Sequence, residues 1–136
     1  MPWVSKVSDR RVAIGLYQEL KAWQAAMSLV AEVYRLTAGL PHSERFGLVQ
    51  QMRRAAISIS SNLAEGHIRR SKREFLRFVV VALGSLAELD SQLLVVERLG
   101  MLPRAELELS MELIGHTGRL LRGLERALIN RLAAGA

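Results

Sequence analysis

Hydrophobic residues recur along most of this chain at steps of three and four positions, which is the spacing of one face of an α-helix. Four segments carry this pattern, and they begin at Leu16, near Ser43, at Ser71 and at Pro103. The chain lacks the period-two alternation of apolar and polar residues that is typical of β-strands. The pattern therefore predicts an all-α fold.

The first segment carries two adjacent apolar lines and ends at Gly39. The lines are Leu20, Trp23, Met27, Val30 and Tyr34, and beside them Ala22, Ala26, Leu29, Val33 and Leu36. The second segment carries one stripe, made of Leu48, Met52, Ala56, Ile59 and Leu63. We expect Gly66 to be its C-terminal cap residue, because glycine enters the left-handed conformation freely.

The third segment begins with Ser71 and Glu74, whose spacing is that of an S-x-x-E capping box. It is expected to reach about Leu99. Its main apolar line is Phe75, Phe78, Val79, Ala82, Leu86, Leu89, Leu93 and Val96. A second line consists of Leu76, Val80, Leu83, Leu94 and Val95. The two lines predict a helix buried on two sides, with Gly84 allowing another helix to approach closely.

The fourth segment follows Gly100 and has Pro103 in its first turn. Its stripe is Leu107, Met111, Ile114, Leu121 and Leu128, and Arg119, Arg122 and Arg126 share another face. Short links force neighbouring helices to run antiparallel, so we predict an up-down-up-down four-helix bundle. The bundle is expected to span residues 16–132, with flexible segments at 1–15 and 133–136.

Composition narrows the class of protein. The chain has 136 residues, half of them hydrophobic, and no cysteine, which excludes disulfides and thiolate metal sites. The N-terminus lacks the apolar stretch of a signal peptide. Glu88, Asp90 and Gln92 interrupt the one stretch, Phe78 to Val96, long enough to span a membrane. We therefore expect a cytoplasmic protein that is not bound to a membrane.

The charge is strongly basic, with 19 Lys and Arg against 13 Asp and Glu, and a net charge of +6. All but three of the basic residues are arginines, whose planar guanidinium groups bind phosphate well. A GC-rich genome would produce the same bias without a function. The candidate nucleic-acid-binding residues are Arg53, Arg54, Arg69, Arg70, Lys72, Arg73 and Arg77. The alternative is a solvated surface whose arginines pair with Glu65, Glu74 or the acids of an adjacent subunit.

Candidate catalytic residues are sparse. His42, His67 and His116 lie far apart in the sequence, without a metal-binding or nucleophile motif. We therefore predict no enzyme activity, no cofactor and no metal, although a site formed across subunits stays open. Glu88 and Gln92 are one turn apart and are expected to fix the register between helices or subunits.

The second apolar lines of the first and third segments also predict self-association, because one small bundle cannot cover them all. The alternative is that every apolar position fits within one core.

Four stretches resemble a known family. They read LKAWQAAMSLVAEVYRLT, FGLVQQMRRAAISISSNLAEG, SKREFLRFVVVALGSLAELDSQL and RLGML. They resemble the four-helix-bundle proteins encoded in intervening sequences of bacterial 23S ribosomal RNA genes, over roughly Leu16 to Leu128. Ser60 stands where the family often has proline, so the second helix is expected to be straighter here.

That family is distantly similar to the accessory variability determinant of diversity-generating retroelements, a basic pentameric bundle that binds nucleic acid and works with a reverse transcriptase. The resemblance implies a ring-shaped homopentamer. Candidate partners are RNA or DNA, a reverse transcriptase, or a ribosome-associated partner.

Together these observations predict a non-catalytic homo-oligomer that binds nucleic acid mainly through phosphate contacts. The alternative is an oligomeric scaffold for other proteins, whose basic charge serves solubility or docking to an acidic partner.

Overall fold

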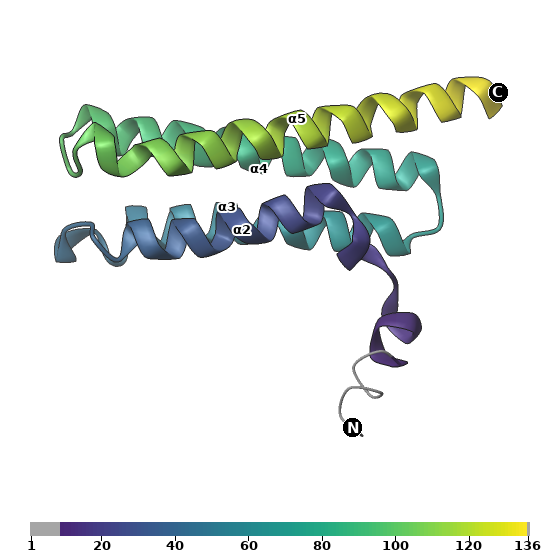
Figure 1. The fold of residues 1–136 in the computed structure, drawn as a ribbon, viewed down its shortest axis with the longest axis horizontal. Coiled ribbons are helices and arrows are strands. Elements are labelled where there is room, and N and C mark those ends of the chain that lie inside the picture. The colour runs from purple at the N-terminus through teal and green to yellow at the C-terminus, as the bar shows by residue number, and fades with distance from the viewer. Residues whose placement is uncertain (1–8, 136) are drawn as a thin grey trace.

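The structure, a computed structural model, describes residues 9–135 of the chain. Four long helices lie side by side (Figure 1). They are α2 (Lys21–Thr37), α3 (Leu48–Ile68), α4 (Lys72–Arg98) and α5 (Arg104–Gly135), with the short 3₁₀ turns η1 (Tyr17–Glu19) and η2 (His42–Glu44) before α2 and α3. The described residues contain no strand, so the predicted all-α fold is confirmed.

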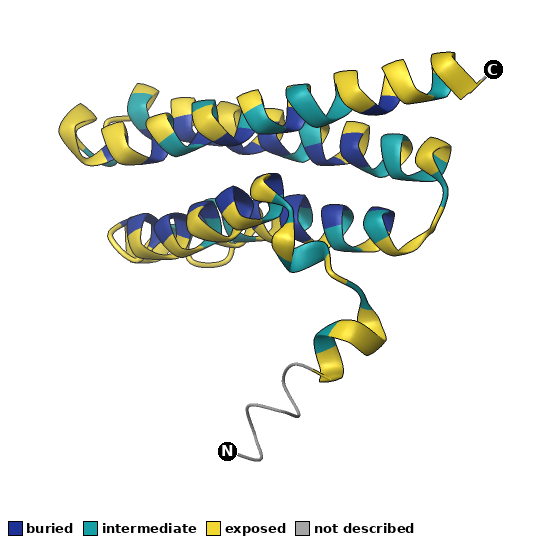
Figure 2. Ribbon diagram, turned by 45° about the vertical axis from the view of Figure 1, so that its right-hand side comes forward, coloured by how far each residue is buried: buried dark blue, intermediate teal, exposed yellow. Residues whose placement is uncertain are grey.

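Each long helix packs against two others. α2 contacts α3 and α5, and α4 also contacts α3 and α5. The chain turns back at each link between them (Figure 1). Buried positions lie on the sides of the helices that face one another, and exposed positions lie on the outside (Figure 2). The core therefore fills the space between the four helices.

The helices near the two ends of the chain differ in their bounds from those predicted. Of the segment 1–15, which the sequence predicts to be flexible, residues 1–8 lie outside the described residues and residues 9–14 are helical. The first long helix begins later than its apolar pattern suggests, because Leu20 is extended (φ −65°, ψ 125°) and separates η1 from α2. At the other end, α5 continues to Gly135.

The core of α2 is formed by the second of its two apolar lines. Ala22, Ala26, Leu29, Val33 and Leu36 are all buried. In the other line, Met27 and Tyr34 are about two-fifths exposed, at 42% and 40%. The predicted stripes of α3, α4 and α5 lie in or against the core, except that Phe78 of α4 is half-buried outside it. The helix α3 continues without a break through Ser60.

Two glycines have roles that differ from those predicted. Gly66 lies inside the last turns of α3 and is buried, so it is not the C-terminal cap. A Cβ atom built on Gly66 would stand 2.6 Å from Cβ of Phe78, so this glycine lets α3 and α4 approach closely. Gly84 does not have that role, because it is exposed and a Cβ atom there would meet nothing within 4 Å.

The predicted N-terminal cap of α4 is present. Ser71 is extended, and its hydroxyl oxygen accepts a hydrogen bond of 3.2 Å from the backbone N–H of Glu74. The residue before it, Arg70, has a φ of 58°. It is the non-glycine residue of positive φ within the described part of the chain, a conformation that costs a side-chain-bearing residue about 1–2 kcal/mol. The reversal between α3 and α4 is therefore tight.

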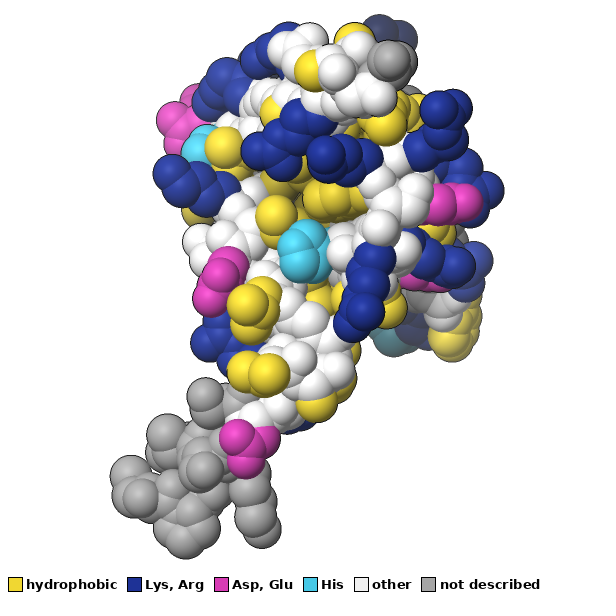
Figure 3. Space-filling view, turned by 90° about the vertical axis from the view of Figure 1, so that its right-hand side faces the viewer, with side chains coloured by type: hydrophobic (Ala, Val, Ile, Leu, Met, Phe, Trp, Pro, Cys, Tyr) yellow, Lys and Arg dark blue, Asp and Glu magenta, His cyan; other side chains and the backbone are white. Residues whose placement is uncertain are grey.

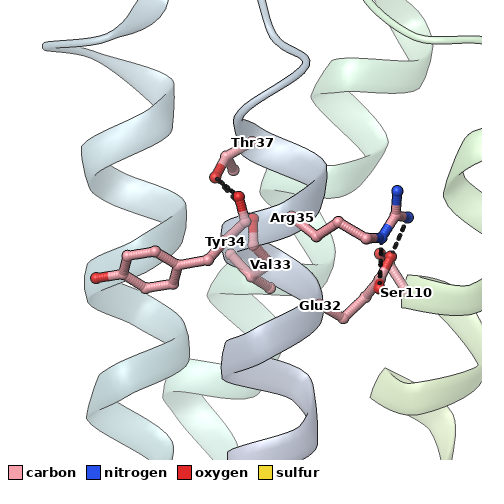
Figure 4. A network of polar contacts seen from close by, with 6 residues as sticks. All are labelled: Glu32, Val33, Tyr34, Arg35, Thr37 and Ser110. Atoms are coloured by element: carbon pink, nitrogen blue, oxygen red, sulfur yellow. Dashed lines mark hydrogen bonds and ion pairs between the residues drawn. The ribbon is translucent and has the colours of Figure 1, made fainter.

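A buried carboxylate joins α2 to α5 (Figure 4). Glu32 is only 6% exposed, yet it lies between apolar neighbours on the core side of α2. Its carboxylate accepts hydrogen bonds from Arg35 on the same helix and from the hydroxyl of Ser110 on α5, at 3.4 Å. The hydrogen bond and the charge of Glu32 raise the pKa of Arg35 above its ordinary value. Partners on both helices thus allow a charged group to sit in the interior.

Replacing Gly66 with alanine tests the close approach of α3 and α4. We expect Gly66→Ala to lower the free energy of unfolding by about 1–3 kcal/mol, because the new methyl group forces Phe78 or the helix backbone to move. Chemical denaturation followed by circular dichroism measures this change.

Gly123→Ala is the matched control. Gly123 lies within α5, and a Cβ atom there would meet only the end of the Arg126 side chain, at 4.0 Å. We expect this variant to gain about 0.5–1 kcal/mol, because alanine favours the helix over glycine. Equal effects of the two substitutions would contradict a special role of Gly66.

Candidate nucleic-acid interface

The seven basic residues that the sequence predicts as a phosphate-binding site do not form one cluster. Arg53 and Arg54 lie near the start of α3, whereas Arg69, Arg70, Lys72, Arg73 and Arg77 lie around the link between α3 and α4. At 1.5 Å per residue, Arg53 and Arg69 are about 24 Å apart along α3. The two groups therefore occupy different parts of the bundle.

Arg53 holds α3 against α2. Its Nε atom donates to Oγ1 of Thr37 at 2.9 Å, and Nη2 donates to the carbonyl oxygen of Tyr34 at 3.4 Å. The guanidinium carbon also lies 4.4 Å from the centre of the Tyr34 ring, which is cation–π geometry. Its neighbour Arg54 is exposed. Arg53 therefore has a structural role that its sequence position does not reveal.

Arg69 and Arg77 are paired with acids on their own helices. Arg69 binds Glu65 at 2.7 Å, and Arg77 binds Glu74 at 3.0 Å. Both guanidinium groups also lie 5.3 Å from the centre of the Phe78 ring. These pairs match the alternative of a solvated, locally neutralised surface. However, exposed ion pairs contribute only about 0–1 kcal/mol, so both arginines stay able to exchange their partner for a phosphate.

The other three basic residues at the link, Arg70, Lys72 and Arg73, are not paired with acids in the described part of the chain. All three are exposed, and none has an ion pair or a side-chain hydrogen bond among residues 9–135. The end of α5 brings Arg131 to the same place, since Arg131 lines one pocket together with Arg70 and Lys72. We call Arg70, Lys72, Arg73 and Arg131 the link cluster.

This end of the molecule is shown in Figure 3, where Lys and Arg side chains surround a patch of hydrophobic side chains with a histidine beside it. The pocket there has a volume of about 480 Å³, and His67 contributes to its wall. Sequence reasoning missed Arg131 and His67 as site residues. The signal for Arg131 was topological, because the end of the fourth helix of an antiparallel bundle lies beside the start of the third.

A second basic surface lies in the groove between α4 and α5. Arg119, Arg122 and Arg126 line it on the α5 side, and its volume is about 660 Å³. The α4 side is formed by Leu83, Leu86, Ala87 and Asp90. Arg122 also pairs with Glu125 at 3.0 Å. This groove combines apolar surface with positive charge and is separate from the link cluster.

The outward side of α4 carries several exposed apolar residues beside charged ones such as Glu88 and Arg98. Seven exposed residues at or just beyond α4 are apolar or lack a side chain, and we call them the outer α4 face: Val80, Val81, Gly84, Ala87, Leu94, Val95 and Leu99. By length and composition alone, α4 is long and apolar enough to span a membrane. Within the bundle, 39% of its most apolar window is buried. The second apolar line of this helix is thus only partly covered by the other helices.

One polar group beside this face has an unsatisfied atom. Gln92 is buried, at 8% exposure, and its Nε2 donates to Oε1 of Glu88 at 3.3 Å. Its Oε1 atom finds no hydrogen-bond partner within residues 9–135.

No group of three or more His, Cys, Asp or Glu residues in residues 9–135 is arranged to hold a metal ion.

The chain matches the model of a known protein family. The sequence model of a family described as 23S rRNA-intervening sequence protein matches residues 18–123. No curated protein matches the chain. The matched region covers α2, α3, α4 and most of α5, so it includes the α3–α4 link and the outer α4 face.

Replacing Arg53 tests whether it is a structural residue. We expect Arg53→Ala to lower the free energy of unfolding by about 1 kcal/mol, because its hydrogen bonds to α2 are lost. Arg54→Ala, one residue away and exposed, should change it by less than about 0.5 kcal/mol. Thermal or chemical denaturation measures both values, and equal stabilities would contradict the assignment.

Proposed function

Because the chain belongs to the 23S rRNA-intervening sequence protein family, we propose that it is a non-catalytic, homo-oligomeric protein that binds nucleic acid in the cytoplasm. The subunit in this proposal is an up-down-up-down four-helix bundle. Contact is mainly with phosphate groups, and the link cluster is the part of the surface that makes it.

The observation that carries this proposal is the convergence of Arg70, Lys72, Arg73 and Arg131 at one end of the bundle. These side chains come from two elements that are far apart in the sequence, and no acid lines the pocket that three of them share. Uncompensated positive charge attracts a polyanion. Phosphate contacts carry no sequence information, so the cluster supports binding that depends little on sequence.

The proposed assembly buries the outer α4 face against other copies of the chain. Exposed apolar residues gathered on one helix in this way favour a contact between proteins. A pentamer is the expected form from the family resemblance. Five copies at +6 each would carry a charge of about +30.

The second candidate function is that of an oligomeric scaffold that docks an acidic protein partner. The α4–α5 groove favours it, because this groove pairs an apolar floor with Arg119, Arg122 and Arg126. An acidic amphipathic helix has the complementary chemistry. In this alternative the nucleic-acid affinity of the link cluster is weak and incidental.

Removing the charge of the link cluster tests nucleic-acid binding. We expect the wild type to bind a generic RNA and a generic DNA duplex at low salt. Its affinity should fall about a hundredfold between about 50 and 200 mM salt if four phosphates are neutralised. The triple variant Arg70/Lys72/Arg73→Gln should bind much more weakly and with a smaller salt dependence. Fluorescence anisotropy titrations measure both quantities.

The triple variant Arg119/Arg122/Arg126→Gln is the matched control, since it loses the same number of positive charges from the groove instead. We expect it to keep most of its affinity. Binding that is absent from the wild type at low salt, or that falls equally in both variants, would reject the link cluster as the interface. A partner protein that binds the wild type but not the groove variant would favour the scaffold.

Charge on the outer α4 face tests the assembly. Leu94 is 49% exposed, so Leu94→Glu should be tolerated by a single subunit but should break a contact between subunits. We expect light scattering to give a multiple of 15.2 kDa for the wild type and 15.2 kDa for this variant. Ile129→Glu is the control, because Ile129 is 48% exposed but lies on α5. A wild type that is monomeric at micromolar concentrations would overturn the assembly.

A further inference from the structure

The pocket at the link end is built from four parts of the chain. Leu20, just before α2, forms one part, and His67 at the end of α3 forms another. The α3–α4 link and first turn of α4 contribute Arg70, Ser71, Lys72 and Phe75. The last turns of α5 contribute Arg131 and the apolar residues before it. Its volume of about 480 Å³ lies within the range of about 300–1,000 Å³ that is usual for small-molecule sites.

The floor of the pocket is apolar and the rim is basic. The floor is formed by Leu20, Phe75, Leu124, Ala127 and Leu128. The rim carries Arg70, Lys72, Arg131 and His67, and no acidic residue lines the pocket. This combination differs from the surface around Arg69 and Arg77, where each arginine is already paired with a glutamate. A ligand that fits must therefore bring its own negative charge and an apolar part.

An aromatic pair fixes one wall. The rings of His67 and Phe75 meet edge to face, with their centres 5.7 Å apart and their planes at 87°. Such pairs are favourable contacts, and this one holds His67 between the end of α3 and the start of α4. An apolar surface next to exposed cationic groups suits a flat ring that carries a phosphate.

We propose that this pocket binds the terminal phosphate monoester of a nucleotide, with the phosphate between Arg70, Lys72 and Arg131 and the base or sugar on the apolar floor. A terminal monoester carries a charge of about −1.5 to −2 at pH 7, whereas each phosphate inside a strand carries one negative charge. Three cationic groups without an acid favour the more highly charged form. The source of the nucleotide is the phosphorylated end of a strand or a free mononucleotide.

This inference rests on the proposed function, because the pocket includes three of the four residues of the link cluster. It goes further by assigning a preference for strand ends. The proposed function alone, in which phosphates contact an open basic surface, predicts no difference between a phosphorylated and an unphosphorylated end.

The test compares short single-stranded RNAs of one sequence, one with a terminal phosphate monoester and one with terminal hydroxyls only. We expect the phosphorylated RNA to bind the wild type about tenfold more tightly. Arg131→Gln should abolish this preference. Arg70→Gly should also abolish it, and this variant should fold well, because glycine favours the positive φ found at this position.

The control variant is Arg126→Gln, which removes an exposed arginine from the same helix but from the α4–α5 groove. It should keep the tenfold preference. Calorimetry with adenosine monophosphate, adenosine and inorganic phosphate forms the second arm. Binding of adenosine monophosphate that is lost in Arg131→Gln assigns a free nucleotide as a source, whereas a phosphate preference without such binding restricts the source to strand ends.

Failure of the two proposals gives different results. If RNA binds the wild type equally with and without the terminal phosphate, and adenosine monophosphate does not bind, the pocket assignment is overturned while the proposed function stands. Equal loss of preference in Arg126→Gln and Arg131→Gln also overturns it. If no strand binds at low salt but adenosine monophosphate does so through Arg131, the proposed function fails and the pocket assignment stands.

Discussion

The close approach of α3 and α4 at Gly66 is the constraint on which the basic end of the molecule depends. Because Gly66 has no side chain, Phe78 fits directly against α3. The chain must then reverse within three residues, from Arg69 to Ser71, and Ser71 caps the new helix at once. The short reversal leaves Arg70 with a positive φ and holds the basic side chains of the link on the end of the bundle, where α5 adds Arg131.

The same packing explains why α4 keeps an apolar surface. A helix in a four-helix bundle contacts two neighbours, and its remaining side faces outward. On α4 this outward side carries exposed apolar residues such as Val81, Leu94 and Val95 among polar ones such as Glu88 and Arg98. The core itself needs no further apolar surface, since it is filled by aliphatic side chains from all four helices. The apolar residues on the outward side of α4 are therefore not required by the core of the subunit, and the proposed assembly is one reason for their presence.

The basic residues differ in what their side chains contact. Arg53 binds α2, and Arg69 and Arg77 bind nearby glutamates. Arg70, Lys72 and Arg73 have no such contacts within the described part of the chain. An arginine that already stabilises the fold or a local pair has less to gain from a phosphate than one that faces only water. Of the basic residues at the link between α3 and α4, Arg70, Lys72 and Arg73 are thus the most available to a ligand.

The sequence by itself determined the helical segments, the capped start of α4 at Ser71 and the surplus apolar line on α4. These features follow from local periodicity and backbone chemistry, which act over a few residues. The tertiary structure decided which apolar line of α2 is buried, that Gly66 serves a helix contact and Gly84 does not, and that Arg53 is bound to α2. It also brought Arg131 beside Arg70. Each of these depends on contacts between residues distant in the chain. A period of three or four residues indicates which faces of a helix are apolar, but it does not show which of two apolar faces is buried or which residues of other helices lie against it.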